Sequence, residues 1–150
     1  MPLVLDLGCG LGVSLLALSA DPAAPPRNYL GVDLDAGKVR FARATASRRG
    51  SPAAFVRDDA LRAASLLAAG YPGPLSLALL QYPTPYSLPG AGNSRLPDRD
   101  GFMVGRPLMA ALGRFRLLYL ASNAPDVAAA MRAAAEAEGF AHREPGGQLS

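Results

Sequence analysis

The sequence predicts an α/β fold, with a doubly wound and mostly parallel sheet of about five to seven strands and helices on both faces. Short apolar segments alternate with helical segments along the chain, a glycine loop directly follows the first of them, and aspartates follow the second and third. Strands that alternate with helices pair in parallel, because each right-handed crossover lies over the sheet. A length of 150 residues fits one domain of this kind.

The first expected strand, Leu3–Leu7, is a short apolar segment that ends at a glycine. A strand that is buried on both faces has this pattern, so we place it in the centre of the sheet. Gly8, Gly10 and Gly12 follow, and a helix at 13–18 comes directly after them. Together these segments form the first half of a βαβ unit.

The same alternation continues along the chain, with glycine and proline at the junctions. Residues 82–101 are rich in proline and glycine and lack a period, so they predict a long loop, which in a compact domain usually has a function. We expect the domain to be truncated at both ends, because the chain begins directly before its first strand. Further strands are expected at 29–33, 54–57, 75–81, 115–121 and 141–144, and further helices at 36–49, 60–69, 107–112 and 124–138.

The composition limits the classes of function. The chain has 15 basic and 12 acidic side chains, and this net charge of +3 permits RNA as a partner without requiring it. Cys9 is the only cysteine and His142 the only histidine, so we expect neither a disulfide nor a metal site. No apolar segment reaches the roughly 20 residues that span a bilayer, and no signal peptide opens the chain. We therefore expect no membrane partner and a location in the cytoplasm or an organelle.

The spacing of the glycines indicates the kind of ligand. Gly8, Gly10 and Gly12 lie at every second position, whereas the dinucleotide pattern G-x-G-x-x-G would need a glycine in place of Val13. Pyrophosphate is therefore not required. A tight turn before a helix instead leaves room for an uncharged nucleoside and an amino-acid tail, with backbone N–H groups facing the ligand.

Aspartates at the strand ends support a nucleoside. Asp33 ends the second strand, where a carboxylate can accept hydrogen bonds from both ribose hydroxyls. Asp59 can accept from the exocyclic amine of adenine, with Leu34 and Ala60 beside the ring. Asp6 either orients the glycine loop or meets an ammonium group of the ligand. The alternative for Asp33 and for Asp59 is an N-terminal helix cap.

Residues that follow parallel strands share one edge of the sheet, where doubly wound folds bind their ligands. Gln81 ends the fourth strand, and we assign it to the same ligand site. Asp6 to Gly12, Asp33, Asp59, Gln81 to Tyr86 and Ser122 to Asn123 are expected along this edge.

These segments resemble the class I S-adenosylmethionine-dependent methyltransferases, which have a Rossmann-like fold. The matching stretches are Leu-Asp-Leu-Gly-Cys-Gly-Leu-Gly at 5–12, Gly-Val-Asp-Leu-Asp at 31–35 and Asp-Asp-Ala at 58–60. The resemblance implies S-adenosylmethionine as cofactor and methyl transfer as the reaction. Cys9 is then a small residue in a crowded turn, since no histidine lies near it in sequence to activate the thiol.

Within this class, Leu79 to Tyr86 looks like a divergent form of the Phe-Pro-Asp-Pro-Trp motif of the tRNA (guanine-N7)-methyltransferases. Arg95 is similar in position to the basic segment of that family, and 118–123 resembles its strand ending in Ala-Thr-Asp. The resemblance implies a tRNA partner, with Tyr82, Pro83, Tyr86 and Arg95 at the substrate.

Two positions depart from that family. Thr84 and Asn123 stand where it has aspartates, and we take them as the candidate catalytic residues. Guanine N7 is an unprotonated lone pair, so transfer to it needs alignment and a dry site but no general base. The alternative for Asn123 is a helix cap.

Two other functions stay open. The altered motif is also compatible with a cofactor-binding paralogue that has lost its substrate chemistry. Pro83 to Tyr86 loosely resembles the Asn-Pro-Pro-Tyr motif of adenine-N6 and glutamine methyltransferases, which would make an amino group the acceptor.

Overall fold

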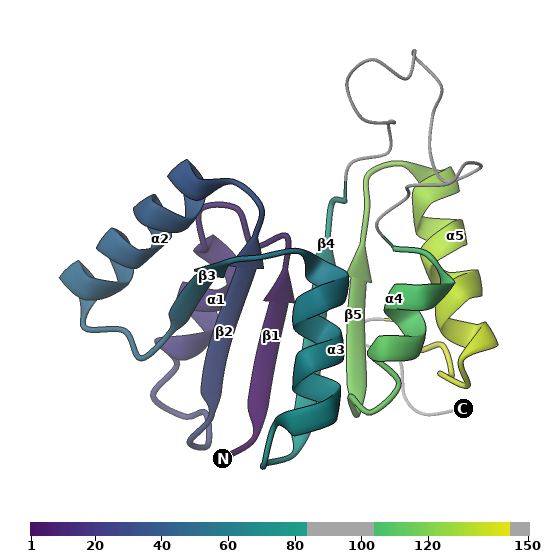
Figure 1. Ribbon diagram of the computed structural model, residues 1–150, viewed down its shortest axis with the longest axis horizontal. Helices are drawn as coiled ribbons and strands as arrows, with labels where there is room; N and C mark the ends of the chain where they lie inside the picture. Colours follow the sequence, from purple (N-terminus) through teal and green to yellow (C-terminus); the bar gives the residue numbers. More distant parts are fainter. Residues whose placement is uncertain (84–103, 145–150) are drawn as a thin grey trace.

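The computed structural model describes residues 1–83 and 104–144, and within them it has one parallel sheet of five strands in the order β3-β2-β1-β4-β5 (Figure 1). The expected α/β architecture is therefore confirmed. The elements are β1 (Leu3–Leu7), α1 (Val13–Ser19), β2 (Asn28–Asp33), α2 (Ala36–Arg49), β3 (Ala54–Arg57), α3 (Ala60–Gly70), β4 (Leu75–Gln81), α4 (Arg106–Ala111), β5 (Leu117–Ala121) and α5 (Pro125–Ala137).

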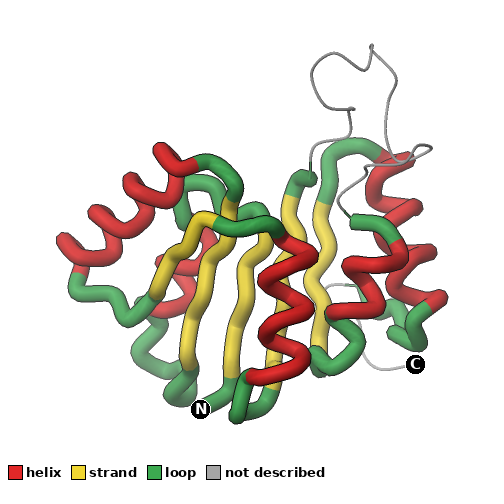
Figure 2. The backbone as a smooth tube through the Cα atoms, viewed as in Figure 1, coloured by secondary structure: helices red, strands yellow, loops and turns green. Residues whose placement is uncertain are grey.

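Helices cover the two faces of the sheet (Figure 2). Side chains of α1 and α2 pack on one face, against Val4, Tyr29 and Phe55. Side chains of α3, α4 and α5 pack on the other face, against Leu5 and Leu7. β1 is buried on both faces, as its apolar sequence predicts, and each fully buried leucine contributes about 1.5–3 kcal/mol.

The strand order reverses at β1, which lies between β2 and β4. At its carboxyl end Leu7 is in register with Val32 on one side and Leu80 on the other, so the three strands end at the same level. A doubly wound fold has its ligand crevice at this position. The glycine loop and the residues after β2 and β4 are therefore brought to one edge, as expected.

The starts of three helices decide between the alternatives left open above. Asp35 caps α2 by accepting from the Lys38 N–H at 3.0 Å, so the cap hypothesis for Asp33 is wrong. Asp59 does cap α3. The cap hypothesis for Asn123 is wrong, because α5 begins after Ala124 and makes no side-chain cap bond.

Two expectations near the end of the chain also need correction. The last strand begins at Leu117, because the Phe115 N–H donates to the Leu112 carbonyl in a turn. Residues 141–144 form no strand and are exposed. Gly139, at φ 94°, follows the end of α5, and the segment after it joins no ladder.

No helix in the described ranges is both long enough and apolar enough to cross a membrane.

The aromatic ring of Phe55 leaves no space for a side chain at Gly31. A Cβ there would lie 2.5 Å from Phe55 Cδ1 and 3.0 Å from Cys9 Sγ. We expect Gly31→Ala to lower the free energy of unfolding by about 1–3 kcal/mol, measured by urea denaturation.

The matched control is Gly70→Ala at the end of α3, where a Cβ has no described neighbour within 4 Å. It should leave stability unchanged or raise it by up to about 1 kcal/mol, because alanine is the better helix former. Equal free energies of unfolding for the two variants would show that the Phe55 ring can move away from the new Cβ without loss of stability.

Candidate functional site

The loop after β1 is held against the end of β2 by backbone hydrogen bonds. The N–H groups of Gly8 and Cys9 both donate to the Val32 carbonyl, at 2.8 and 3.0 Å. Gly8, Gly10 and Gly12 have φ values of 73°, 57° and 83°, which glycine adopts far more readily than other residues. The spacing of the glycines in the sequence is therefore the spacing of the left-handed positions in this turn.

The loop has one packed side and one open side. A Cβ on Gly12 would lie 2.7 Å from the Phe55 ring, so this glycine allows the start of α1 to approach β3. A Cβ on Gly10 would meet no described atom within 4 Å. The backbone at Gly10 is thus accessible to a ligand.

Asp33 connects the loop to the next helix. Its Oδ2 accepts from the Gly10 N–H at 2.9 Å, and its Oδ1 accepts from the Asp35 N–H at 2.9 Å. Each carboxylate oxygen can accept two hydrogen bonds, so among the described residues one acceptor position per oxygen is left for a ligand. The side chain is half-buried at the end of β2, where it can both position the loop and bind hydroxyl groups.

Asp6 lies in β1, in register with Gly31 of β2 and Leu79 of β4, and is buried. Burial, and secondarily the negative charge of Asp33, raises the pKa of its carboxyl to about 6. A carboxylate in such surroundings favours a cation next to it, because a cation offsets both causes of the shift. The site is therefore electrostatically suited to a positively charged ligand.

Cys9 belongs to the glycine loop and is buried, and its thiol is close enough to Asp6 and Asp33 to feel their charges. Burial, and to a smaller extent the negative charges of Asp6 and Asp33, raises the pKa of its thiol to about 12. The thiol is protonated at neutral pH, so it cannot act as a nucleophile. This agrees with its interpretation as a small residue in a crowded turn.

The residues after β2 and β3 form the next part of the edge. The Leu34 side chain is 66% exposed, and the Arg57 Nε–H donates to the Leu34 carbonyl at 3.0 Å, which ties the two strand ends together. Asp59 is exposed and accepts from the Arg62 N–H at 2.8 Å, while the next residue, Ala60, is buried in the core. Asp59 thus starts α3 whether or not it also binds a ligand.

The end of β4 contacts both neighbours. Ser14, in the first turn of α1, donates its hydroxyl to Gln81 Oε1 at 2.8 Å. The Tyr82 N–H donates to the Ala121 carbonyl at 2.7 Å, and its ring is exposed, whereas Pro83 is buried. Sequence reasoning missed Ser14, although it is the one hydroxyl in the otherwise apolar start of α1.

Several expected residues are not brought together by described contacts. Thr84, Tyr86 and Arg95 lie outside the described residues. Asn123 is exposed after β5, where the preceding Ser122 hydroxyl accepts from the Ala124 N–H at 3.1 Å. Across residues 1–83 and 104–144, no group of three histidine, cysteine or acidic residues is placed to hold a metal ion.

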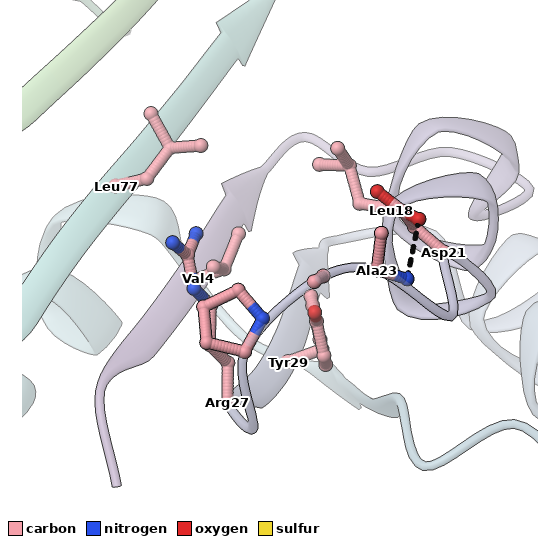
Figure 3. A pocket seen from close by; sticks show the side chains of 9 residues that line it. Val4, Leu18, Asp21, Ala23, Arg27, Tyr29 and Leu77 are labelled. Carbon is pink, nitrogen blue, oxygen red and sulfur yellow. Dashed lines mark hydrogen bonds between the residues drawn. The ribbon is translucent and has the colours of Figure 1, made fainter.

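A hollow of about 340 Å³ lies elsewhere, with Leu77 of β4 on one side and Leu18 of α1 on the other (Figure 3). Val4 and Tyr29, near the amino ends of β1 and β2, also line it. It is therefore separate from the glycine loop, which follows the carboxyl end of β1.

Solved structures of larger proteins share this fold. One, described as "Conversion of a Disulfide Bond into a Thioacetal Group during Echinomycin Biosynthesis", is 24% identical, with a TM-score of 0.51 over 76% of this chain and 40% of that one. PKMT2 from Rickettsia typhi is 18% identical, with a TM-score of 0.54 over 76% of this chain and 19% of that one. StiE O-MT residues 942–1257 are 15% identical, with a TM-score of 0.52 over 78% and 36%. The chain therefore spans less than half the length of each of these structures.

A search of curated proteins found no match. A family model described as a methyltransferase domain matches residues 4–85. The matched segment contains the glycine loop, Asp33, Asp59 and the end of β4, which all lie at or after the carboxyl ends of strands in the sheet. Since the match covers more than half of the chain, the protein belongs to the methyltransferase-domain family, whose methyl donor is S-adenosylmethionine.

Proposed function

We propose that this chain is an S-adenosylmethionine-dependent methyltransferase that holds its cofactor in the crevice at the carboxyl ends of β1, β2 and β4. The observation that carries the proposal is the bond between Gly10 and Asp33. It places a carboxylate with unused acceptor positions beside a glycine backbone that is open to a ligand. When bound, the cofactor supplies an electrophilic methyl group on a sulfonium.

The nucleoside half of the cofactor fits the residues that follow β2 and β3. Asp33 accepts from the ribose hydroxyls, and Asp59 accepts from the adenine amine. Leu34 and Ala60 flank the adenine ring. The exposed Leu34 side chain supports this role, because covering a large apolar side chain with a ring removes it from water and so favours binding.

The amino-acid half fits the glycine loop. The backbone of Gly8, Gly10 and Gly12 allows close approach of the tail, and Gln81 bonds its polar end from β4. Asp6 supplies negative charge beneath the loop. The cofactor carries an ammonium and a sulfonium group, so its charge complements the buried Asp6 and the half-buried Asp33.

For the acceptor, we propose guanine N7 of a tRNA. Support comes from Tyr82 and Pro83, which stand at the end of β4 where the resembled motif has its substrate residues, and from the net charge of +3. Asn123 follows β5 on the same edge and offers an amide to a base. N7 attacks through its own lone pair, so the residues only have to align the base and exclude water.

Isothermal titration of S-adenosylhomocysteine into the chain tests the cofactor half, and transfer of tritium from labelled S-adenosylmethionine to unmodified tRNA tests the acceptor. Label in 7-methylguanosine supports the proposal. Label in N6-methyladenosine identifies an amino-group enzyme instead. Binding without any transfer to tRNA contradicts the guanine proposal and favours the inactive paralogue.

Asp33→Ala removes the acceptor for the ribose and for the Gly10 N–H. We expect at least about tenfold weaker binding of S-adenosylhomocysteine by titration, because hydrogen bonds to charged groups contribute about 1.5–3 kcal/mol. Asp21→Ala is the control, since this exposed carboxylate bonds only the Ala23 N–H among described residues and lies away from the crevice. Equal affinities of the two variants would remove Asp33 from the site.

Asp6→Asn should make the ligand-free protein more stable at pH 8. The raised pKa means that the folded state holds the Asp6 proton between about pH 4 and 6 while the unfolded state releases it. The free energy of unfolding therefore falls as the pH rises through this range, and the full loss, up to about 3 kcal/mol, applies above pH 6.

The measurement is urea unfolding of both proteins at pH 8 and pH 4. The asparagine variant should be more stable at pH 8, and the advantage should disappear at pH 4. If the two proteins differ in stability by the same amount at both pH values, the raised pKa of Asp6 is contradicted. The variant should also lose more affinity for cationic S-adenosylmethionine than for S-adenosylhomocysteine, whose sulfur is neutral.

A further inference from the structure

Tyr82 is the one residue other than glycine that has a left-handed backbone in the described part of the chain, with φ at 52°. Bulky side chains are rarely found there. The next residue is Pro83, and a residue that precedes proline normally has an extended backbone. Such a conformation costs free energy and persists only where the surroundings impose it.

The surroundings of Tyr82 hold it from three sides. The Ser14 hydroxyl bonds the Gln81 side chain at 2.8 Å and so ties the preceding residue to α1. The Tyr82 N–H bonds the Ala121 carbonyl of β5 at 2.7 Å. Pro83 is buried on the other side of the turn.

Burial of the tyrosine ring does not compensate for this strain, since Tyr82 is 62% exposed. The ring is attached at the end of β4, beside the reversal of strand order and next to the helix that follows the glycine loop. Exposed aromatic rings in fixed positions bind planar bases by stacking. Strain that is retained around an exposed ring indicates a binding role.

We propose that the Ser14–Gln81 hydrogen bond is a latch that keeps Tyr82 in its left-handed conformation, and that the Tyr82 ring is the platform on which a planar acceptor base stacks. Ser14 and Gln81 are then positioning residues for the acceptor, in addition to the contact of Gln81 with the cofactor. The platform rests on the proposed methyltransferase function, while the latch is a property of the chain by itself.

The latch is tested by melting temperatures, without any ligand. Tyr82→Gly relieves the strain, so its melting temperature should rise by about 2–4 °C. In a Ser14→Ala background the turn is free to relax, and the same substitution should give less than half of that rise. No rise in the unmodified chain, or equal rises in both backgrounds, would overturn the latch.

Ser19→Ala is the matched control background. Ser19 lies on the same helix, and its hydroxyl is 2.8 Å from the Ser51 hydroxyl at the end far from the crevice. The rise for Tyr82→Gly should be fully kept in this background. If the rise in melting temperature is lost in the Ser19→Ala background too, then any weakening of α1 has this effect, and the specific role of Ser14 is overturned.

The platform is tested by titrating guanosine into the chain saturated with S-adenosylhomocysteine. Guanosine should bind about tenfold more weakly to Tyr82→Gly and to Ser14→Ala, whereas Tyr82→Phe and Ser14→Thr should retain binding. No binding of guanosine, or equal affinities in all variants, would overturn the platform. If S-adenosylhomocysteine itself does not bind, the proposed function fails, and the melting experiment still decides on the latch.

Discussion

The hydrogen bond from the Gly10 backbone to the Asp33 carboxylate is the contact on which the candidate site depends. It joins two turns that are 23 residues apart in sequence and follow adjacent strands. The second oxygen of the same carboxylate bonds the Asp35 N–H, and Asp35 in turn caps α2. One side chain therefore sets the position of the glycine loop and of the residues leading into the next helix.

Asp6, which is buried near this contact, opposes the stability of the fold without ligand. Asp6 is buried beside Asp33, and no cationic group is among the causes of its shifted pKa. Proteins tolerate such an arrangement where a bound cation relieves it, at some cost to the stability of the free protein. Relief of the free-energy cost of the buried Asp6 carboxylate thus becomes part of the driving force for binding a positively charged cofactor.

The sequence was sufficient for the five strands of the sheet, because apolar segments, helix starts and glycine spacing all indicate the same elements, but it also predicted a strand at 141–144 that does not form. It placed the caps less well. Asp33 and Asp35 are both aspartates before α2, and only the geometry shows that the first bonds the loop and the second the helix. Asn123 precedes a proline-initiated helix and has a suitable side chain, yet the cap position falls on Ala124.

The contacts that sequence reasoning missed are those between distant side chains. The Ser14–Gln81 bond spans 67 positions, and no local pattern indicates it. The left-handed conformation of Tyr82 likewise depends on β5 and α1, because neither tyrosine nor a following proline favours it locally. Local sequence propensity thus predicts the helices and strands, whereas contacts between distant residues determine the arrangement at the carboxyl ends of the strands.

The position of Cys9 has a practical consequence. Its thiol is the only one in the chain, is buried close to Gly31 of β2, and stays protonated at neutral pH. Iodoacetamide reacts with thiolates that it can reach, so alkylation of this chain requires the loop to lift away from β2. The rate of alkylation therefore reports how often the loop opens, with a single reactive group built into the sequence and no label to introduce.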